Sequence, residues 1–159
     1  MPQRSLRTID TIPVGPLGII PLQSCAELGK EVDKYLVNWR HANTSEHKTN
    51  IIFSGYEKDS YIVNASVPRF GSGEAKAIIS ESVRGKDIYL IVDVCNYSIT
   101  YSLCGMTNRM SPDDHYQDLK RIIAAIAGKA RRINVIMPFL YESRQHKRSS
   151  RESLDCALA

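Results

Sequence analysis

Apolar residues recur along this chain with periods that predict strands and helices. Residues 17–22 form a short apolar run that is typical of a strand. Apolar side chains then follow at three- and four-residue steps, which predicts a helix that covers a sheet. This apolar face comprises Leu28, Val32, Tyr35, Leu36 and Trp39. Ser24 precedes the helix and Glu27 lies three residues later, so the two form a candidate capping box.

The strongest strand pattern lies at residues 87–94, which read DIYLIVDV. A nearly continuous apolar run is typical of a strand buried on both faces, and it predicts a central strand with helices on either side. Weaker strand patterns occur at residues 61–67, where Pro68 ends the pattern, and at residues 75–80. Between them, two glycines within three residues predict a turn at residues 70–74.

A second helix is predicted to begin at Ser111, because a capping hydroxyl is followed there by Pro112 and two acids. Its apolar face comprises Leu119, Ile122, Ile123 and Ile126, and Gly128 is suited to its end. Residues 133–137 then predict another buried strand. This order of strand, helix and strand predicts parallel pairing with a right-handed crossover. The fold class is therefore α/β, with a largely parallel sheet flanked by helices.

Composition places the chain among ordinary globular proteins. Its 159 residues are 43% hydrophobic and 24% charged, which fits one domain with a real core. A net charge of +4 permits an anionic ligand but does not demand nucleic acid. No apolar run approaches the roughly 20 residues that span a bilayer, so no membrane partner is expected. The N-terminus lacks a signal-peptide core, and the expected compartment is the cytoplasm.

Two further features bear on metals and on the surface. None of the four cysteines lies in a CxxC pair, so the sequence predicts buried free thiols and no zinc site. Residues 38–60 are mostly polar and predict a surface excursion that ends in a strand-like stretch at residues 51–54. His41 and His47 fall in this segment, where solvated histidines are the expected state.

Positive charge is concentrated after Pro138, a residue that ends strand pairing because it has no N–H to donate. Arg144, Lys147, Arg148 and Arg151 follow, and no acid lies between the first and the last of them. In α/β proteins the carboxyl edge of the sheet is where ligands bind. Because neighbouring cations repel one another, an anion such as a polyphosphate is expected to bind among them. The spacing does not say which anion.

Two stretches resemble ribose-phosphate pyrophosphokinase, the enzyme that makes phosphoribosyl pyrophosphate (PRPP). INVIMPFLYESRQ followed by HKRSSRE, at residues 133–152, is similar to the strand and the flexible catalytic loop of that family. RFGSGEAKAIISESVRG, at residues 69–85, resembles its Phe-x-x-x-Glu turn and its Glu-Ser-Val-Arg-Gly motif. The stretches occur in the family's order. The resemblance covers most of residues 17–159 and implies a phosphoribosyltransferase-like fold, as in the amino-terminal half of that enzyme.

The resemblance also implies the reaction, which is transfer of diphosphate from ATP to ribose 5-phosphate with Mg²⁺. On this basis Arg144 and Gln145 contact ATP, while Lys147 and Arg148 lie on the loop that closes over the transition state. Such groups act by preorganised electrostatics, and a loop can admit ATP and then exclude water. The matching residues predicted to hold adenine are Phe70, Ser72 and Glu74, and those predicted to bind a regulatory phosphate are Ser82 and Arg84.

Further implications concern assembly and length. In the family the adenine turn serves the active site of a neighbouring subunit, so a homo-oligomer is expected. The family's ligands for Mg²⁺ and ribose 5-phosphate match positions beyond residue 159. The apolar helical stretch at residues 153–159 also ends without a cap. Residues 1–159 are therefore expected to be one α/β domain, the amino-terminal part of a longer chain that is inactive alone.

Departures from the family pattern keep two alternatives open. His146 stands where the family has an acid, Ser72 replaces an Asn or Asp, and Ser153 replaces a proline. Residues 38–60 are a surface insertion relative to the family pattern. One alternative is a non-catalytic relative that associates with the synthetase and regulates it. The other is a basic nucleic-acid-binding module over residues 129–151, which is disfavoured because no aromatic is interleaved with the cations after Tyr141.

Overall fold

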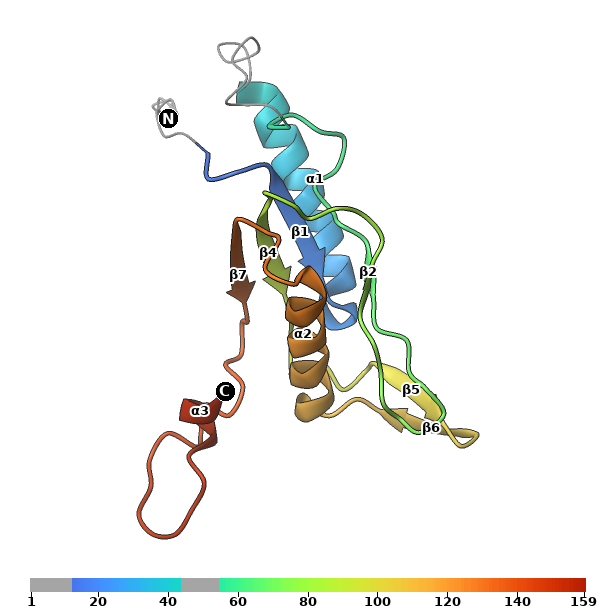
Figure 1. Cartoon of the computed structure of the whole chain (residues 1–159), viewed down its shortest axis with the longest axis vertical. Coiled ribbons are helices and arrows are strands. Elements are labelled where there is room, and N and C mark those ends of the chain that lie inside the picture. Colours follow the sequence, from blue (N-terminus) through green and yellow to red (C-terminus); the bar gives the residue numbers. More distant parts are fainter. Residues whose placement is uncertain (1–12, 44–54) are drawn as a thin grey trace, which may run out of the picture.

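The computed structural model describes residues 13–43 and 55–159. Its centre is a parallel sheet in the order β1 (Leu17–Pro21), β4 (Asp87–Ile91) and β7 (Arg132–Ile136), shown in Figure 1. Strand β4 lies in the middle and pairs in parallel along its whole length with both neighbours. Ile88 and Leu90 are completely buried there. The predicted α/β class, the parallel sheet and the central strand are confirmed.

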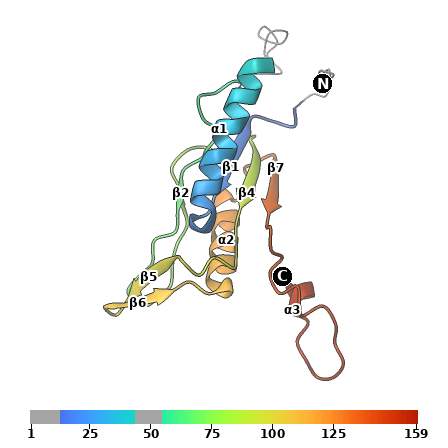
Figure 2. The same cartoon turned by 180° about the vertical axis from the view of Figure 1, so that it is seen from behind.

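Two long helices cover opposite faces of this sheet, α1 (Ala26–Asn43) and α2 (Pro112–Ile126), as Figures 1 and 2 show. Successive side chains of a strand point to opposite faces, so Ile19 of β1 packs in the α1 cluster and Ile20 packs in the α2 cluster. The α1 cluster also contains Cys25, Tyr61, Ile91, Val32 and Leu36. The α2 cluster also contains Ile88, Leu90, Val92, Leu119, Ile122 and Ile126.

Helix α2 begins and ends where its sequence predicts. Ser111 is the N-cap: its backbone N–H donates to Asp114 Oδ2 at 2.9 Å, while the N–H of Asp114 donates to Ser111 Oγ at 3.2 Å. This reciprocal capping box satisfies two N–H groups that the helix leaves free. At the other end Ala127 and Gly128 have φ values of 52° and 67°, so the chain leaves the helix through the left-handed region.

The predicted capping box at Ser24 is wrong. The chain leaves β1 through a single 3₁₀ turn, η1 (Gln23–Cys25), and α1 starts only at Ala26. Ser24 is buried, and its Oγ accepts a hydrogen bond from the backbone N–H of Asp93 at 3.1 Å. Glu27 instead pairs with Lys30 at 2.8 Å on the exposed face. Ser24 therefore ties the end of β1 to the chain after β4.

The buried face of α1 is also rotated from the predicted one. Leu28 and Tyr35 are 49% and 68% exposed, whereas Val32 and Leu36 pack on the sheet as expected. The helix approaches β1 so closely that a Cβ on Gly29 would lie 2.4 Å from the Pro21 ring. Backbone contact at this glycine sets the rotation, which side-chain periodicity does not reveal.

Strand β7 forms where it is predicted, but it is not a buried strand. It is the outer strand of the described sheet, and Val135 and Ile136 are 43% and 45% exposed. Two side-chain contacts attach it to β4: Arg132 donates to both oxygens of Asp87, at 2.9 and 2.6 Å, and Asn134 donates to Asp87 Oδ1 at 2.9 Å. The apolar run therefore marks a strand without showing how deeply it is buried.

The remaining strands are short. Residues 61–67 and 75–80 contribute the antiparallel pair β2 (Ala65–Ser66) and β3 (Ile78–Ile79), a parallel bridge between Ile19 and Ile62, and an antiparallel bridge between Arg69 and Ala75. Residues 100–109 fold into a hairpin of β5 (Thr100–Leu103) and β6 (Met106–Arg109), which the sequence pattern does not predict. Its two-residue turn has φ values of 52° and 78°, as a type I′ turn requires. A last turn of helix is α3 (Asp155–Leu158).

Part of the predicted 38–60 insertion is helical, because α1 continues to Asn43. The strand-like stretch at residues 51–54 and His47 lie outside the described residues. After the gap, Tyr56 returns to the helix: Arg40 donates to its carbonyl oxygen at 2.9 Å, and the guanidinium lies over its ring at 4.2 Å. The four cysteines are free thiols as expected, but only Cys25 is buried. Within the described ranges, each helix is too short or too polar to cross a membrane.

Candidate functional site

The positively charged segment leaves the carboxyl end of β7, as predicted. We call residues 139–153 the cationic loop. All three strands of the sheet run parallel, so this loop starts at the same edge where β1 and β4 end. Arg144, Lys147 and Arg148 are all exposed, and none is ion-paired with a carboxylate of the described residues. The loop extends away from the body of the chain in Figures 1 and 2.

Among the described residues, the contacts between the loop and the body lie near its base. Tyr141 stacks on Tyr116 of α2, with ring centroids 4.1 Å apart and planes 9° apart. Its hydroxyl donates to Asp113 Oδ1 at 2.6 Å, and this hydrogen bond raises the pKa of Tyr141. The cationic part of the loop is closed by a backbone hydrogen bond, in which the N–H of Cys156 donates to the carbonyl of Gln145 at 3.2 Å. The stacked pair therefore fixes where the loop begins, and the cations lie beyond it.

Gln145 differs from the neighbouring cations. Its side-chain oxygen Oε1 is buried and accepts no hydrogen bond within the part of the chain that the structure describes. A buried acceptor without a donor costs about 1–3 kcal/mol, so this oxygen favours any ligand that offers an N–H or O–H group. Sequence reasoning selected Gln145 by resemblance alone, and the structure adds this chemical reason.

The turn at residues 70–74 is closed by its own backbone. The N–H of Phe70 donates to the carbonyl of Glu74 at 2.7 Å, and the N–H of Gly73 donates to the carbonyl of Phe70 at 2.9 Å. Ser72 Oγ donates to Glu74 Oε2 at 2.9 Å, which orients that carboxylate. Phe70 is 48% exposed. The turn therefore presents an aromatic ring and a carboxylate to solvent from a fixed backbone.

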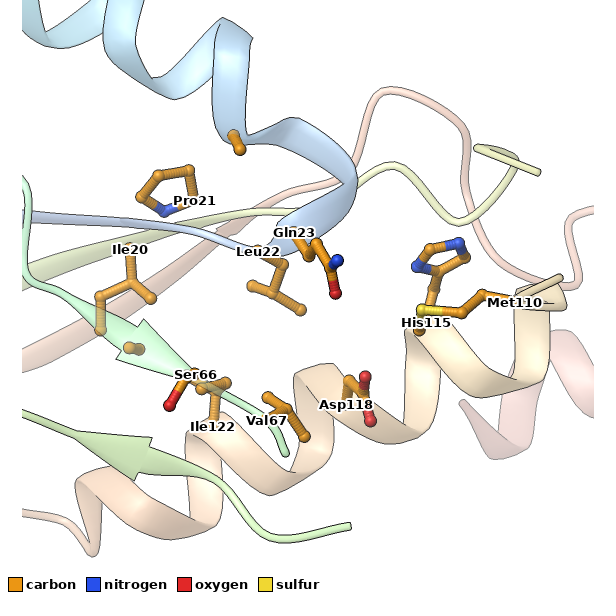
Figure 3. A pocket seen from close by; sticks show the side chains of 12 residues that line it. Ile20, Pro21, Leu22, Gln23, Ser66, Val67, Met110, His115, Asp118 and Ile122 are labelled. Atoms are coloured by element: carbon orange, nitrogen blue, oxygen red, sulfur yellow. The ribbon is translucent and has the colours of Figure 1, made fainter. Parts of the chain in front are cut away.

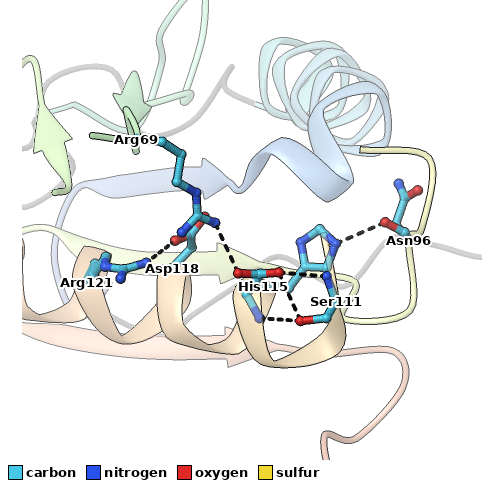
Figure 4. A network of polar contacts seen from close by, with 7 residues as sticks. Arg69, Asn96, Ser111, His115, Asp118 and Arg121 are labelled. Atoms are coloured by element: carbon cyan, nitrogen blue, oxygen red, sulfur yellow. Dashed lines mark hydrogen bonds and ion pairs between the residues drawn. The ribbon is translucent and has the colours of Figure 1, made fainter. Parts of the chain in front are cut away.

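A network of charged residues lies directly behind this turn (Figure 4). The Arg69 guanidinium contacts Asp118 Oδ2 at 3.0 Å and Asp114 Oδ1 at 3.9 Å, and Asp118 Oδ1 accepts from Arg121 at 2.6 Å. Arg69 also lies over the ring of Tyr101 in β5, 4.9 Å from its centroid. Burial raises the pKa of Asp118, although the hydrogen bond from Arg121 and the charge of Arg69 oppose that rise.

Sequence reasoning missed this network because its members are far apart in the chain. Arg69 and Asp118 are separated by 49 positions. The available signal was weak: two acids spaced four residues apart on the predicted second helix, and a basic residue just before the predicted turn. Neither feature indicates which distant residue it pairs with.

A cavity of about 250 Å³ lies beside the network, between α2, β2 and the end of β1 (Figure 3). Most of its wall is apolar, and the polar side chains that line it are Gln23, Ser66, His115 and Asp118. His115 is buried, and its Nε2 lies 3.0 Å from the carbonyl oxygen of Asn96. Both oxygens of Asp118 are already bound by arginines. None of the site residues predicted from sequence lines this cavity.

The predicted site residues do not converge within one chain. The 70–74 turn lies beside the β5–β6 hairpin and the cationic loop lies beyond β7, and both views show them on opposite sides of the body (Figures 1 and 2). Ser82 and Arg84 precede β4, so they lie at the amino edge of the sheet. Ser82 Oγ accepts from the N–H of Arg84 at 3.3 Å, and both residues are exposed.

The described residues offer little to a metal ion. No cluster of three or more His, Cys, Asp or Glu side chains within residues 13–43 and 55–159 could hold one. Mg²⁺ prefers oxygen ligands such as carboxylates in an octahedral arrangement, and the acids of α2 are occupied by arginines, by the helix cap or by the Tyr141 hydroxyl. These residues therefore do not form a Mg²⁺ site, and no chemical step is derived through one.

Comparison with known proteins identifies the family. The family described as the N-terminal domain of ribose phosphate pyrophosphokinase matches residues 17–159. Ribose-phosphate pyrophosphokinase B of Dictyostelium discoideum is 32% identical over 97 residues, which are 60% of this chain and 26% of that protein. Ribose-phosphate pyrophosphokinase of Buchnera aphidicola is 34% identical over 86 residues, which are 54% of this chain and 23% of that protein.

A solved structure agrees with the fold. The crystal structure of phosphoribosylpyrophosphate synthetase from Mycobacterium smegmatis superposes with a TM-score of 0.58 at 22% sequence identity. The match covers 89% of this chain and 36% of that one. The aligned region is about a quarter of the length of the curated relatives. The family match covers nearly the whole chain, which therefore belongs to the ribose-phosphate pyrophosphokinase family and corresponds to its N-terminal domain.

Proposed function

We propose that this chain is the ATP-binding N-terminal portion of a ribose-phosphate diphosphokinase, which makes PRPP for nucleotide biosynthesis. The observation that carries the proposal is the family match over residues 17–159. In the proposed reaction the 1-hydroxyl oxygen of ribose 5-phosphate attacks the β-phosphorus of ATP. The bond from that phosphorus to the oxygen bridging to the α-phosphate breaks, and AMP leaves. The chain spans about a quarter of its relatives, so this activity is proposed for the complete gene product, and residues 1–159 alone are predicted to be inactive.

In this proposal the cationic loop stabilises the transferring diphosphate. Arg144 binds the ATP phosphates, and Lys147 and Arg148 approach when the loop closes. Negative charge grows on the phosphoryl oxygens and on the leaving AMP, and positioned cations lower that barrier. The exposed cations, unpaired with any described carboxylate, support this role. Gln145 binds ATP beside Arg144, and its buried oxygen without a donor supports that contact.

The 70–74 turn is proposed to hold adenine. Phe70 offers a half-exposed face for stacking, and Glu74 offers a carboxylate for the exocyclic amine. Ser72 belongs to the same proposed adenine site, where its hydroxyl orients the carboxylate of Glu74. Because the turn and the cationic loop lie on opposite sides of the body, we propose that the turn of one copy completes the site of another. The protein is then a homo-oligomer.

Three further assignments belong to the proposal. Ser82 and Arg84 bind a regulatory phosphate at the amino edge of the sheet, where both are exposed. Mg²⁺ arrives with ATP, and its protein ligands and those of ribose 5-phosphate are supplied from outside residues 1–159. The proposed compartment is the cytoplasm. Neither nucleic acid nor a membrane is proposed as a partner.

The test is AMP release by the complete gene product, measured with and without ribose 5-phosphate. The proposal expects release only when ATP, Mg²⁺ and ribose 5-phosphate are all present. A protein that releases no AMP but changes the activity of a partner synthetase is a regulatory relative, and that outcome overturns the catalytic proposal. Tight binding of single-stranded RNA with a steep salt dependence, and no AMP release, indicates the nucleic-acid module instead.

A further inference from the structure

Arg69 and Phe70, the two neighbouring residues at the start of the 70–74 turn, differ in how far their side chains are exposed. The Arg69 side chain is only 10% exposed, whereas Phe70 is 48% exposed. Arg69 lies in the stem of the turn, where it forms an antiparallel bridge with Ala75. Neighbouring side chains of an extended segment point to opposite sides. The chain therefore directs a guanidinium inward and an aromatic ring outward at this point.

The inward guanidinium joins the turn to two other elements. It contacts Asp118 at 3.0 Å and Asp114 at 3.9 Å on α2, and it lies over the Tyr101 ring on β5. A planar guanidinium can pair with carboxylates along its edge and stack on an aromatic through its face. One side chain thus joins the stem of the turn to both the helix and the hairpin, in addition to the apolar packing of Val67 and Ala77 on the α2 cluster.

The turn's own hydrogen bonds do not provide this attachment. Within the described residues, the hydrogen bonds made by residues 70–74 join members of the turn to one another. They set the shape of the turn but not its orientation on the body. Leu103 of the hairpin lies beside Gly73, where an added Cβ would be 3.5 Å from its Cδ1. Arg69 is therefore the polar link between the turn and α2.

We propose that Arg69 is a positioning residue that orients the 70–74 turn for its nucleotide and thereby sets the preference for ATP over GTP. This inference rests on the proposed function, in which Phe70 and Glu74 contact adenine. The carboxylate of Glu74 accepts from the exocyclic amine of adenine and repels the carbonyl oxygen at the same place in guanine. That discrimination needs a fixed carboxylate, because a turn that can reorient meets either base.

Arg121 provides a matched control. It pairs with Asp118 through the other carboxylate oxygen, at 2.6 Å, but it belongs to α2 and makes no described hydrogen bond or ion pair to the turn. Arg69→Gln and Arg121→Gln each remove one guanidinium from the same buried acid. Of the two substitutions, only Arg69→Gln removes the contact between the turn and α2. An effect seen in Arg69→Gln but not in Arg121→Gln therefore reports on the position of the turn, and an effect common to both reports on the loss of one partner of Asp118.

The experiment measures KM for ATP, GTP and ribose 5-phosphate, together with the melting temperature, in the complete gene product. We expect Arg69→Gln to raise KM for ATP about tenfold, and to reduce the ratio of kcat/KM for ATP to that for GTP by a similar factor. KM for ribose 5-phosphate is expected to stay within about twofold of the wild-type value. Arg121→Gln is expected to match the wild type in nucleotide kinetics. Equal nucleotide effects in the two variants overturn the proposal.

Two more variants cover the remaining outcomes. If Arg69→Gln does not fold, Tyr101→Leu loosens the same link without leaving a buried charge, and it is expected to reduce the ATP preference about threefold. An unchanged preference in that variant then overturns the proposal. Phe70→Ala distinguishes the proposed adenine contact from the positioning role of Arg69. If KM for ATP rises in Phe70→Ala but stays at the wild-type value in Arg69→Gln, the positioning role alone is overturned. Wild-type KM in Phe70→Ala removes the proposed adenine contact and the inference with it.

Discussion

The 70–74 turn and the cationic loop are both exposed, but the rest of the chain holds them in different ways. Two backbone hydrogen bonds close the turn, and Arg69 attaches its stem to α2. The loop is attached at its base, where Tyr141 stacks on Tyr116, and a backbone hydrogen bond between Gln145 and Cys156 closes its cationic part. Between these two residues, the described side-chain hydrogen bonds join only near neighbours within residues 149–155.

This difference separates two tasks that nucleotide chemistry requires. Recognition of a base benefits from a rigid surface, because its conformational entropy is lost during folding instead of during binding. Closure over a reacting phosphate needs a segment that can admit ATP and then move. The turn has the structure expected for the first task and the loop has the structure expected for the second. The predictions that follow test this contrast, from the largest expected effect to the smallest.

The largest effect is expected from Arg144→Ala in the cationic loop. Removing one preorganised positive group from a site of charge development typically costs about 10²–10³ in kcat, so turnover should fall by about that factor with little change in melting temperature. Arg131→Ala is the matched control, because Arg131 is also exposed but lies at the amino end of β7. Turnover of Arg144→Ala at the wild-type level would remove the loop from the proposed chemistry.

Limited trypsin digestion compares the two segments directly. Cleavage after Arg144, Lys147 or Arg148 should be faster than cleavage after Arg69 by roughly 100-fold, because the stem must open before a protease can bind it. Mass spectrometry of the early fragments gives the ratio. Heat-unfolded protein should lose the difference, which controls for the intrinsic preference of the protease. Early cleavage after Arg69 would show that the turn is not held as described.

Local patterns predicted the elements whose signals lie close together in the sequence. The start of α2 needs only Ser111 and the three residues after it, and strand β4 needs only its own apolar run. The β5–β6 hairpin was missed although its first strand carries a local signal, since apolar and polar residues alternate from Ile99 to Leu103. Its second strand is mostly polar and exposed, and the other local signal is Gly105 in the two-residue turn.

The candidate site was predictable only in part, for a related reason. The positions of the turn and of the cationic loop follow from glycines, a proline and clustered charge, all of which are local. What anchors the turn depends on pairing across 49 positions, between Arg69 and Asp118. Likewise the burial of Ser24 depends on the distant backbone of Asp93. A single sequence carries no signal for such pairs until the fold places them together.

A smaller effect, on the free energy of unfolding, is expected when the two glycines of the turn are replaced by alanine. Gly73 has a φ of 90°, which side chains with a Cβ rarely adopt, whereas Gly71 has no positive φ and open space around it. Gly73→Ala should lower the free energy of unfolding by about 1 kcal/mol, and Gly71→Ala should change it by only a few tenths, about the entropic gain of replacing glycine. Urea unfolding measures both. Equal effects would mean that the turn relaxes easily, which contradicts its proposed rigidity.

The smallest effect concerns Glu152, near the end of the cationic loop. Its pKa is lowered, chiefly because the backbone N–H of Ser149 donates to it at 3.2 Å and the Ser150 hydroxyl donates at 3.1 Å. A carboxylate with a lowered pKa stabilises the local turn above its ordinary pKa, and this contribution is lost as pH falls through the lowered value. NMR titration of the Glu152 carboxyl should therefore give a pKa below the ordinary glutamate value, and the amide signals of residues 149–152 should change in parallel. Global stability should not follow this titration, because the turn is local to a loop that the core does not hold. If unfolding did follow it, the loop would be coupled to the body as closely as the 70–74 turn.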